Sequence, residues 1–494
     1  MKKFIIFISI STIILFLGQD LNPFSPYFFT FHDETQPARI QQFTKELKNL
    51  HIPPRVAPDM NFGIGYPVFN FYAPTAYWIT SFFHLLNFSI INALKISFLA
   101  ALILAFYGAF KFFTLFFDFW PALAGGFFYV LSLYFPLDIF VRGNLAEIWF
   151  LALLPLSIFF IIKISQKKII DKKIFLTNTI ILTIILTSHN IFSLIFFIWI
   201  IPFIILFSKN RLINLISLLT ALGLGAYFWL PVILETKYTF AKEVATLTFY
   251  QNHFLCPTQL WQSPWGFGGS APGCLNDGMS FKIGKVQVIL FIFGVFFFAY
   301  HLLISKKNKS SKSSFLPLYF LISTCFFLFL TVYQSAFFWK LFENYLNIIQ
   351  FPWRFIGLSI LGIAFFSSYF LQAIKIPYKS FLIFLVILTT FLLNQKYFFG
   401  QKIKNEVFEK KYLSQNYIKN QVAFKMAEYL PKTNNYQLWR SLEKKKTTKN
   451  DIKKLTLAPF DKKKQTPIEV VANLITLLSF IFLIFFSRYY GKKL

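Results

Sequence analysis

Long apolar runs separated by short polar stretches fill most of this chain. We predict twelve membrane spans, since runs of about 17–25 apolar residues suit the hydrocarbon core, near residues 4–17, 75–117, 121–136, 146–163, 174–188, 191–207, 212–233, 286–304, 315–333, 355–373, 380–398 and 469–487. The run 75–117 is too long for one crossing, so Pro74 to Leu86 is predicted as an interfacial or half-inserted helix, with the full span starting near Ile90. The pattern predicts an all-α polytopic membrane protein.

Basic residues mark one side of this bundle. With twelve crossings, six basic groups fall on the same side: Lys2-Lys3, Lys163 to Lys173, Lys209 with Arg211, Lys306 to Lys312, Lys375 with Lys379, and Arg488 to Lys493. The positive-inside rule makes that side cytoplasmic, together with both chain ends. The opposite side receives 18–74, 137–145, 189–190, 234–285, 334–354 and 399–468. The last segment is rich in Lys, but long segments translocate largely regardless of charge.

Composition agrees with a membrane protein and helps to divide the chain. Hydrophobic residues make up 56% and charged residues 14%, against about 45–50% and 25% in soluble domains. Met1-Lys2-Lys3 and the apolar run after it resemble a signal peptide, but no small-x-small cleavage site precedes Gln19, so we expect an uncleaved first span. The predicted parts are a core over 1–398, a Lys-rich outer linker over 399–468, and a final span with a cytoplasmic tail over 469–494.

Cysteines and familiar motifs add little chemistry. Cys256 and Cys274 share the outer loop 234–285, where the compartment is oxidising, so they form either a disulfide or two unpaired thiols. Cys325 lies inside a span and is predicted to be a small apolar filler. The sequence has no GxxxxGK[ST] and no HExxH, which argues against a nucleotide-powered pump within this chain and a zinc metalloprotease.

The first outer loop holds the most informative polar residues. It begins with His32-Asp33-Glu34, and Arg39 follows five residues after Glu34. Pro37 suits a first helical turn, and an amphipathic helix lying in the membrane interface is predicted from the spacing of Ile40, Phe43, Leu47 and Leu50.

Further along this loop, residues 62–74 combine many aromatic side chains with Gly63, Gly65, Pro67 and Pro74. Irregular backbone cannot face lipid, so the segment must pack on protein or line a cavity. The alternative is an interfacial belt of aromatic residues. The density of Pro and Gly favours a cavity wall.

Other charged residues stand at the outer ends of predicted spans. Asp138 and Arg142 precede Asn144 and Glu147, which are three residues apart and share a helix face. Ionisable residues at such positions mark functional sites by default, although an Arg142–Glu147 pair could be purely structural. The remaining candidates, each also explicable as a helix cap or an interfacial anchor, are His189, Glu235 and Arg354.

The order of these motifs resembles that in the GT-C superfamily of membrane glycosyltransferases. In its protein O-mannosyltransferase and aminoarabinose transferase branches, the first outer loop also reads Asp-Glu, interfacial helix, Pro-Pro and Tyr-Trp, here Asp33-Glu34, Pro53-Pro54 and Tyr77-Trp78. Arg142 through Glu147 resembles that superfamily's Arg-x-x-x-x-Asp. Here Glu147 replaces the aspartate, and no large outer soluble domain follows.

A closer resemblance is to bacterial integral membrane proteins labelled "6-pyruvoyl-tetrahydropterin synthase-related". It covers about residues 1–435 and rests on an ordered series of motifs: His32-Asp33, Gly65-Tyr66-Pro67, Phe69 to Pro74, Arg142-Gly143, Ala146-Glu147, Ser188-His189-Asn190, Phe228 to Pro231, Phe351 to Arg354 and Glu428 to Pro431. The label is a misnomer, because the chain has no pterin-synthase zinc constellation and is polytopic.

The resemblance implies transfer of a sugar from a polyprenyl-phosphate donor, with inversion, at the outer face of the cytoplasmic (inner) membrane. Asp33 would be the general base and Glu34 would position the acceptor or share a proton. Arg142 and Arg354 would stabilise the lipid phosphate. The superfamily pattern admits a divalent cation between Glu147 and the phosphate without requiring it.

Five more residues are expected to line the substrate site: His32, Arg39, Asn144, Glu147 and His189. Membrane lipid is the other expected partner, and no nucleic acid is expected. The main alternative is a non-enzymatic flippase or transporter of lipid-linked sugars, which needs the arginines but no general base. A structural assembly protein, the third interpretation, gives the outer acids no role.

Overall fold

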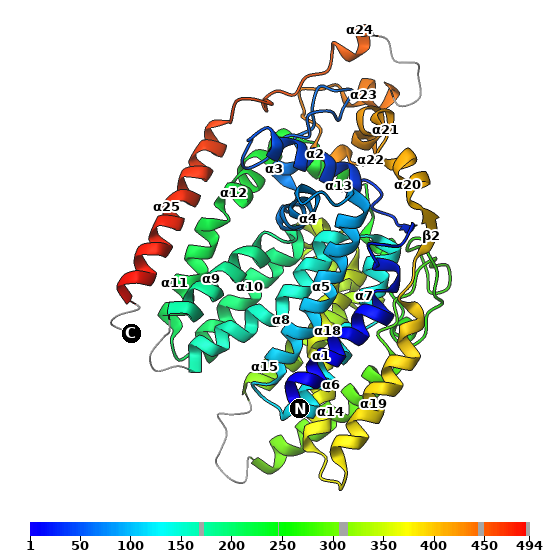
Figure 1. The fold of residues 1–494 in the computed structure, drawn as a ribbon, viewed down its shortest axis with the longest axis vertical. Coiled ribbons are helices and arrows are strands. Elements are labelled where there is room, and N and C mark those ends of the chain that lie inside the picture. The colour runs from blue at the N-terminus through cyan, green and yellow to red at the C-terminus, as the bar shows by residue number, and fades with distance from the viewer. Residues whose placement is uncertain (167–171, 246, 306–314, 443–448, 491–494) are drawn as a thin grey trace.

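Helices account for most of the computed structural model, which describes residues 1–166, 172–245, 247–305, 315–442 and 449–490 (Figure 1). The principal helices are α1 (Lys2–Thr12), α2 (Gln36–Lys48), α3 (Val68–Phe71), α4 (Thr75–Leu85), α5 (Ile90–Phe113), α6 (Phe119–Val130), α7 (Tyr134–Pro136), α8 (Leu145–Gln166), α9 (Lys172–Leu186), α10 (Asn190–Phe207), α11 (Arg211–Leu224), α12 (Ala226–Glu235), α13 (Ala241–Ala245), α14 (Lys285–Ser305), α15 (Phe315–Thr331), α16 (Ala336–Leu341), α17 (Glu343–Leu346), α18 (Phe355–Ala373), α19 (Lys379–Asn394), α20 (Asn405–Tyr412), α21 (Gln415–Asn420), α22 (Val422–Lys425), α23 (Tyr436–Leu442), α24 (Lys449–Ile452) and α25 (Pro467–Tyr490). The sheet pairs β1 (Tyr27–Thr30) antiparallel with β2 (Gln401–Lys404).

Eight helices within the described residues are long and apolar enough to cross a membrane, which indicates a multi-pass membrane protein. A ninth crossing results if α11 and α12, bent by 69° at Gly225, count as one. The other three predicted spans form shorter helices, α9, α15, and α1 with its π-helical extension Ile13–Leu17. Twelve crossings therefore stay a prediction. The basic group Lys306 to Lys312 lies outside the described residues.

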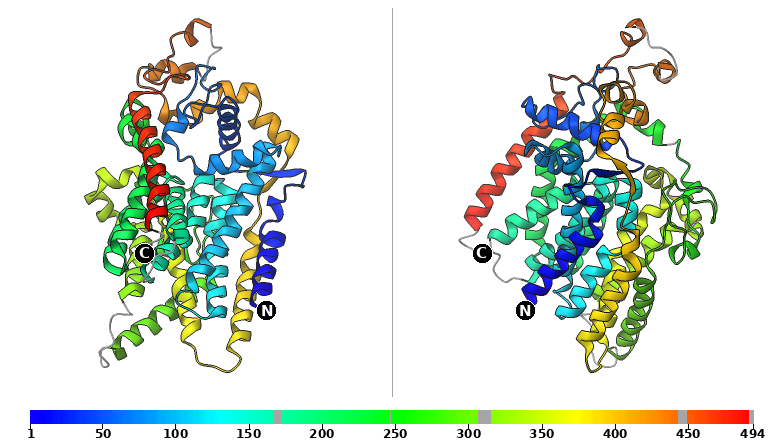
Figure 2. Two further views of the ribbon diagram at one scale, coloured as in Figure 1. Left: turned by 60° about the vertical axis from the view of Figure 1, so that its left-hand side comes forward. Right: turned by 45° about the vertical axis from the view of Figure 1, so that its right-hand side comes forward.

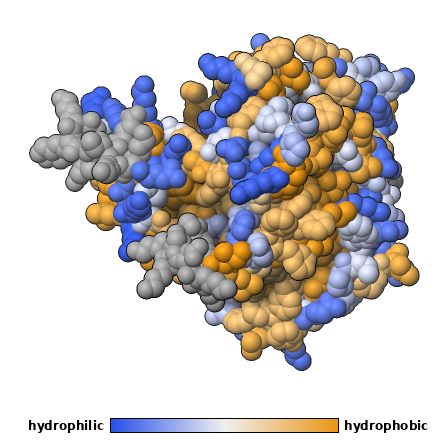
Figure 3. All heavy atoms as spheres, turned by 90° about the horizontal axis from the view of Figure 1, so that it is seen from below, coloured by the Kyte–Doolittle hydropathy of each residue, from blue (hydrophilic) through white to orange (hydrophobic). Residues whose placement is uncertain are grey.

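The bundle has two unlike ends. The N-terminus and the C-terminal end of α25 lie in the lower half of Figure 1, and the short helices α2, α3 and α20 to α24 gather above the bundle. The last helix, α25, runs along the outside in both views of Figure 2, against α11 and α12. Seen from below, broad apolar areas are interrupted by hydrophilic side chains (Figure 3). Segments predicted to lie on the outer side are thus found together at one end, as the contacts of residues 18–74 with the segment 399–468 show.

The predicted outer loop 137–145 is wrong at its start. Residues Leu137–Arg142 form a π-helical turn that continues the α6 and α7 segment, so one candidate span runs over Phe119–Arg142. Only Gly143 and Asn144 then separate it from α8, and Gly143 has the left-handed φ of +66°. Asp138 and Arg142 are consequently buried in the bundle instead of lying in a loop.

The predicted linker 399–468 is folded onto the first outer loop. Residues 399–442, here called the cover segment, begin with β2 paired to β1 and continue through α20 to α23. The Phe62 backbone N–H donates to the carbonyl of Lys419 at 2.7 Å, and Trp439 Nε1 donates to Asn61 Oδ1 at 3.0 Å. The cover segment therefore packs directly on residues 61–62 of the first predicted outer loop.

Helix α2 is more enclosed than the sequence suggests. Ile40 and Phe43 are buried as predicted, but Arg39 is buried too, because the cover segment lies over that face. Leu50 was predicted on the apolar face and is instead 81% exposed, since α2 ends at Lys48. Residues 62–74 pack on protein, with Phe71 stacked on Tyr429 at 5.5 Å.

The structure shows the state of all three cysteines. Cys256 and Cys274 form a disulfide that closes the outer loop, with their Cα atoms 5.6 Å apart. Cys325 was predicted to fill space inside the bundle, but it lies exposed on the outward surface of α15.

Candidate functional site

Glu147 is the centre of a buried group of charged side chains. It lies in the first turn of α8, where Asn144 caps the helix by accepting from the Glu147 backbone N–H at 3.1 Å. Its carboxylate accepts hydrogen bonds from the Tyr134 hydroxyl and from Asn144 Nδ2, the latter at 3.0 Å. Glu147 is fully buried, and a buried carboxylate needs such partners to offset its lost hydration.

Arg142 joins two carboxylates. Its Nη1 atom lies 3.0 Å from Glu147 Oε2 and also donates to Asp138, four residues earlier in the same helical segment. The Arg142 guanidinium is 4.7 Å from the centre of the Trp353 ring, a cation–π distance. Arg142 is therefore held on three sides.

Arg354 approaches Glu147 from just before α18 and is less well satisfied. Its Nε lies 4.0 Å from Glu147 Oε2, and Nε has no hydrogen-bond partner among the described residues. Nη1 donates to the Ile349 carbonyl at a long 3.4 Å. The side chain is only 14% exposed, so few of its five donors can reach solvent. Arg354 is thus the member of the group best suited to bind an additional anion.

His189 caps α10 and also faces Glu147. Its Nδ1 accepts from the Phe192 backbone N–H at 3.1 Å, while Nε2 lies 3.8 Å from Glu147 Oε2. A neutral imidazole that accepts at Nδ1 carries its proton at Nε2. Both roles considered for this residue from sequence, helix cap and member of a polar site, therefore coexist.

Burial lowers the pKa of His189 to about 3, and nearby Glu147 only partly opposes this shift. A histidine whose folded pKa is depressed contributes stability that is present above its ordinary pKa of about 6.5 and lost as pH falls toward 3. We expect the melting temperature of the native protein to decrease as the pH is lowered from 7 to 4.5. In His189→Asn, which keeps the helix cap, this decrease should be smaller. Equal slopes for the two proteins would contradict this expectation.

The first outer loop joins this group through its backbone. The N–H groups of His32 and Asp33 donate to the carbonyls of Val141 and Arg142 at 3.0 and 2.9 Å. Beside them, the Phe31 ring covers Gly143, where a Cβ would lie only 2.1 Å from the ring. Glycine is thus required at 143 by both its positive φ and this close approach. Asp33 is in this way fixed next to Arg142.

The Asp33 side chain has a polar environment of its own. It accepts from Thr35 Oγ1 at 3.0 Å and from Gln36 Nε2, and it lies 3.4 Å from Arg39 Nη2. Its side chain remains 25% exposed. A carboxylate that is oriented by donors yet still reaches solvent can accept a proton from a bound hydroxyl.

Arg39 is anchored from several directions. It donates to the Tyr77 hydroxyl at 3.1 Å and to Met426 Sδ, and its guanidinium lies 4.6 Å from the centre of the Tyr72 ring. Burial raises the pKa of Tyr72 to about 12; the negative charge of Asp33 adds to this shift, and the positive charges of Arg39 and Arg354 oppose it. Tyr72 thus stands between the Asp33 group and the Glu147 group, and it stays protonated.

Two predicted site residues point elsewhere. Glu34 forms an ion pair with Lys425 of the cover segment. Among the described residues it shares no hydrogen-bond donor with Asp33, which accepts from Thr35 and Gln36. The His32 ring is exposed and lies 3.0 Å, through Nε2, from the Phe267 carbonyl of the loop 234–285. Their predicted roles in proton sharing and substrate contact therefore lack geometric support.

Glu428 is a second carboxylate near Asp33. Burial raises its pKa, and the charges of Arg39 and Asp33 act on it in opposite directions. The neighbouring Tyr429 is fixed by donating its backbone N–H to the Tyr66 hydroxyl at 3.0 Å. Sequence analysis included Glu428 only as part of a motif, because its distance along the chain hides its proximity to the first loop.

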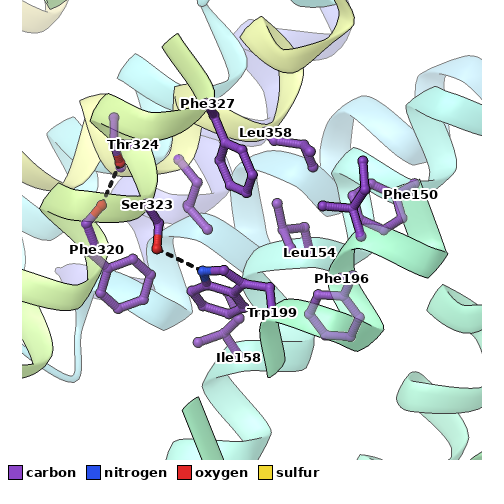
Figure 4. A pocket seen from close by; sticks show the side chains of 13 residues that line it. Phe150, Leu154, Ile158, Phe196, Trp199, Phe320, Ser323, Thr324, Phe327 and Leu358 are labelled. Carbon is purple, nitrogen blue, oxygen red and sulfur yellow. Dashed lines mark hydrogen bonds between the residues drawn. The ribbon is translucent and has the colours of Figure 1, made fainter. Parts of the chain in front are cut away.

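An apolar pocket begins about one helical turn from the charged group. It lies between α8, α10, α15 and α18 and has a cavity volume of about 40 Å³ (Figure 4). Phe150 follows Glu147 by three residues, and Leu358 follows Arg354 by four, so the pocket continues from the charged group into the bundle. The lining residues are Phe150, Leu154, Ile158, Ile195, Phe196, Trp199, Phe320, Ser323, Thr324, Phe327, Leu358, Leu361 and Gly362.

The pocket presents almost no free polar group. Trp199 Nε1 donates to Ser323 Oγ at 2.8 Å, and Thr324 Oγ1 donates to the Phe320 carbonyl at 2.7 Å (Figure 4). A pocket with such walls suits a hydrocarbon chain.

The residues near Glu147 do not fit a divalent cation. Both carboxylate oxygens already accept hydrogen bonds, and Arg142 lies 3.0 Å from one of them. A cation there would have to displace Arg142 or lie against it. Among the described residues, no group of three or more His, Cys, Asp or Glu side chains is arranged to hold a metal.

Four predicted residues therefore lie together, Arg142, Glu147, His189 and Arg354, with Asn144 at the helix cap. Asp33 and Arg39 form an adjoining group. Tyr134 was not predicted as a site residue, and Tyr72 was included only as part of the predicted cavity wall 62–74. Asp138 was predicted as a loop residue, although its i,i+4 spacing to Arg142 is the helical signal for this pair.

The sequence matches no protein-family model and no curated protein. Functional inference therefore rests on the geometry of the site and on the resemblance of its motifs.

Proposed function

We propose that this protein transfers a sugar from a polyprenyl-phosphate donor to an acceptor hydroxyl at the outer membrane–water boundary. One observation carries the proposal: the largely buried and under-bonded guanidinium of Arg354 lies about one helical turn from an apolar pocket, beside Arg142 and one loop from Asp33. A phosphate linked to a long hydrocarbon chain combines the two chemistries that this arrangement would bind.

The phosphate belongs with the arginines. Guanidinium groups bind phosphate through paired N–H donors, and they do so most strongly where water is excluded. Arg354 has donors to spare, whereas Arg142 is largely engaged by Asp138 and Glu147. Glu147 keeps the two positive charges together, and Arg354 supplies the main contact with the lipid phosphate.

The acceptor belongs with Asp33. The oxygen of its hydroxyl attacks the anomeric carbon while the bond from that carbon to the phosphate oxygen breaks, and the hydroxyl proton passes to the Asp33 carboxylate. The polyprenyl phosphate leaves with the bonding electron pair, and its added negative charge is stabilised by the arginines. Asp33 and Arg142, adjacent through a backbone hydrogen bond, would serve the two sides of this transfer.

The pocket provides a test that does not depend on the acceptor. Leu154→Trp should weaken binding of a long-chain polyprenyl phosphate, because the larger indole ring occupies the space in the pocket that the lipid chain would need. We expect a loss of roughly tenfold, about 1.4 kcal/mol, measured as Kd in detergent-solubilised protein. Binding of a single-isoprene phosphate should change little.

Leu206→Trp is the matched control, because Leu206 is 61% exposed on the outward surface of α10. A similar loss in both variants, or no loss in Leu154→Trp, would place the lipid chain outside this pocket.

A further inference from the structure

The segment between α15 and α18 presents an unusual apolar surface. Four large side chains in residues 336–349 are 55–78% exposed: Phe337, Leu341, Tyr345 and Ile348. Phe337 and Leu341 are four residues apart and share one side of α16, Tyr345 lies in α17, and Ile348 lies in the 3-10 turn Asn347–Ile349 that follows. These four side chains are here called the apolar stripe. Lys340 and Glu343, both exposed, lie between them in sequence. Exposed apolar side chains with charged residues between them are typical of a segment in the membrane interface.

The opposite side of this segment is anchored in the protein. Trp339 is fully buried and donates Nε1–H to the Leu330 carbonyl at 3.0 Å. Tyr250 stacks on Trp339 at 5.0 Å and donates to Glu343 Oε1 at 3.3 Å. The exposed stripe therefore belongs to a segment with a defined position.

The stripe continues the outward surface of α15. Phe337 contacts Phe329 at 6.1 Å and Phe338 contacts Phe326 at 5.6 Å, both between ring centroids. Helix α15 is itself apolar, and Ile322 on its surface is 61% exposed. In a membrane, the exposed face of α15 contacts lipid hydrocarbon. The apolar stripe continues this face without a break, so it contacts the same lipid.

The segment ends on the candidate site. After α17 the chain turns at Gln350, which has a φ of +63°, and the Ile349 carbonyl accepts the hydrogen bond from Arg354 Nη1. This is the hydrogen bond that the Arg354 guanidinium makes within the described residues. The position of the segment thus influences where the guanidinium lies.

We propose that residues 336–349 are a bilayer-contact segment, with Phe337, Leu341, Tyr345 and Ile348 inserted at the acyl–headgroup boundary of a phospholipid membrane, and that this insertion positions Arg354. The membrane contact is independent of the proposed function; its effect on donor binding rests on that function.

Spin labels test the contact directly. Nitroxides are attached to Leu341→Cys and Tyr345→Cys in a Cys325→Ser background that keeps the disulfide, and the protein is reconstituted in vesicles of phosphatidylethanolamine and phosphatidylglycerol. Collisions with oxygen should exceed those with a water-soluble nickel chelate at both positions. Lys410→Cys, exposed on α20 of the cover segment, is the control and should show the opposite preference. The same pattern at all three positions overturns the membrane contact.

A second measurement tests the link to Arg354. The double variant Leu341→Asp/Tyr345→Asp should bind undecaprenyl phosphate roughly tenfold more weakly, while Asn416→Asp/Lys410→Asp on the cover segment should not. Unchanged binding in the first double variant, with labels that report insertion in the native segment, overturns the link to Arg354. If the native protein binds no polyprenyl phosphate, the proposed function and this link fail together, whereas the label results still decide the membrane contact.

Discussion

Replacing Asp33 with asparagine should lower sugar transfer by roughly 10²–10⁴-fold. The amide keeps the size of the side chain, and its single oxygen can still accept from either Thr35 or Gln36, but it cannot take a proton from the acceptor. Donor binding should survive, because the lipid phosphate is assigned to the arginines. The measurement is the rate of labelled-sugar transfer in membrane vesicles, with donor binding measured in parallel.

Asp59→Asn is the matched control, since Asp59 belongs to the same outer loop but pairs with Lys45 near the surface. It should leave transfer nearly unchanged. Normal transfer by Asp33→Asn would remove the general base from the mechanism and favour the flippase alternative, in which the same arginines guide a lipid-linked sugar without any bond being broken.

Replacing Arg354 with alanine should weaken donor binding by roughly 10- to 100-fold, because a hydrogen bond to a charged group contributes about 1.5–3 kcal/mol. Glu147 remains paired with Arg142 in this variant, so the group keeps a positive charge beside its carboxylate. Kd for polyprenyl phosphate in vesicles is the quantity to measure. Arg354→Lys should recover part of the loss, since it restores the charge but not the paired donors.

Arg211→Ala serves as the control, because Arg211 is exposed at the start of α11. If Arg354→Ala has the same melting temperature as the native protein and its Kd is unchanged, the phosphate binds elsewhere.

Much of the helical framework could be predicted from the sequence, because hydrophobic run length is a direct physical requirement for crossing a bilayer. The eight long apolar helices coincide with predicted spans. The count of twelve is not established, since α9, α15 and α1 are shorter than a full crossing and α11 bends at Gly225 before α12. Run length alone does not say whether a short apolar helix crosses or packs within the bundle.

The candidate site was partly predictable for a different reason. Charged residues at span ends are costly unless they are paired, so Arg142, Glu147 and Arg354 could be recognised singly. Their mutual contacts could not be derived, because they depend on how α8, α10 and α18 pack. The π-helical turn that buries Asp138 changed a predicted loop into part of a helix, and the i,i+4 spacing of Asp138 and Arg142 was the one local sign of it.

The cover segment was the least predictable part. Its composition, rich in Lys, indicated a linker, and composition does not reveal long-range pairing. Contacts such as Met426 with Arg39 and Lys425 with Glu34 join positions almost four hundred residues apart. These contacts reassign Glu34 from the predicted reaction to an ion pair, and they bring Glu428 close to Asp33.

The central claim is that Arg354 and the apolar pocket bind a polyprenyl-phosphate-linked sugar that Asp33 then helps to transfer. Mass spectrometry of lipids that co-purify with Asp33→Asn and Arg354→Ala proteins tests it most directly. The account predicts that Asp33→Asn retains a polyprenyl-phosphate-linked sugar, since donor is bound but not consumed, and that Arg354→Ala loses it. Absence of any polyprenyl-phosphate lipid from Asp33→Asn, or equal amounts in both variants, would contradict the account.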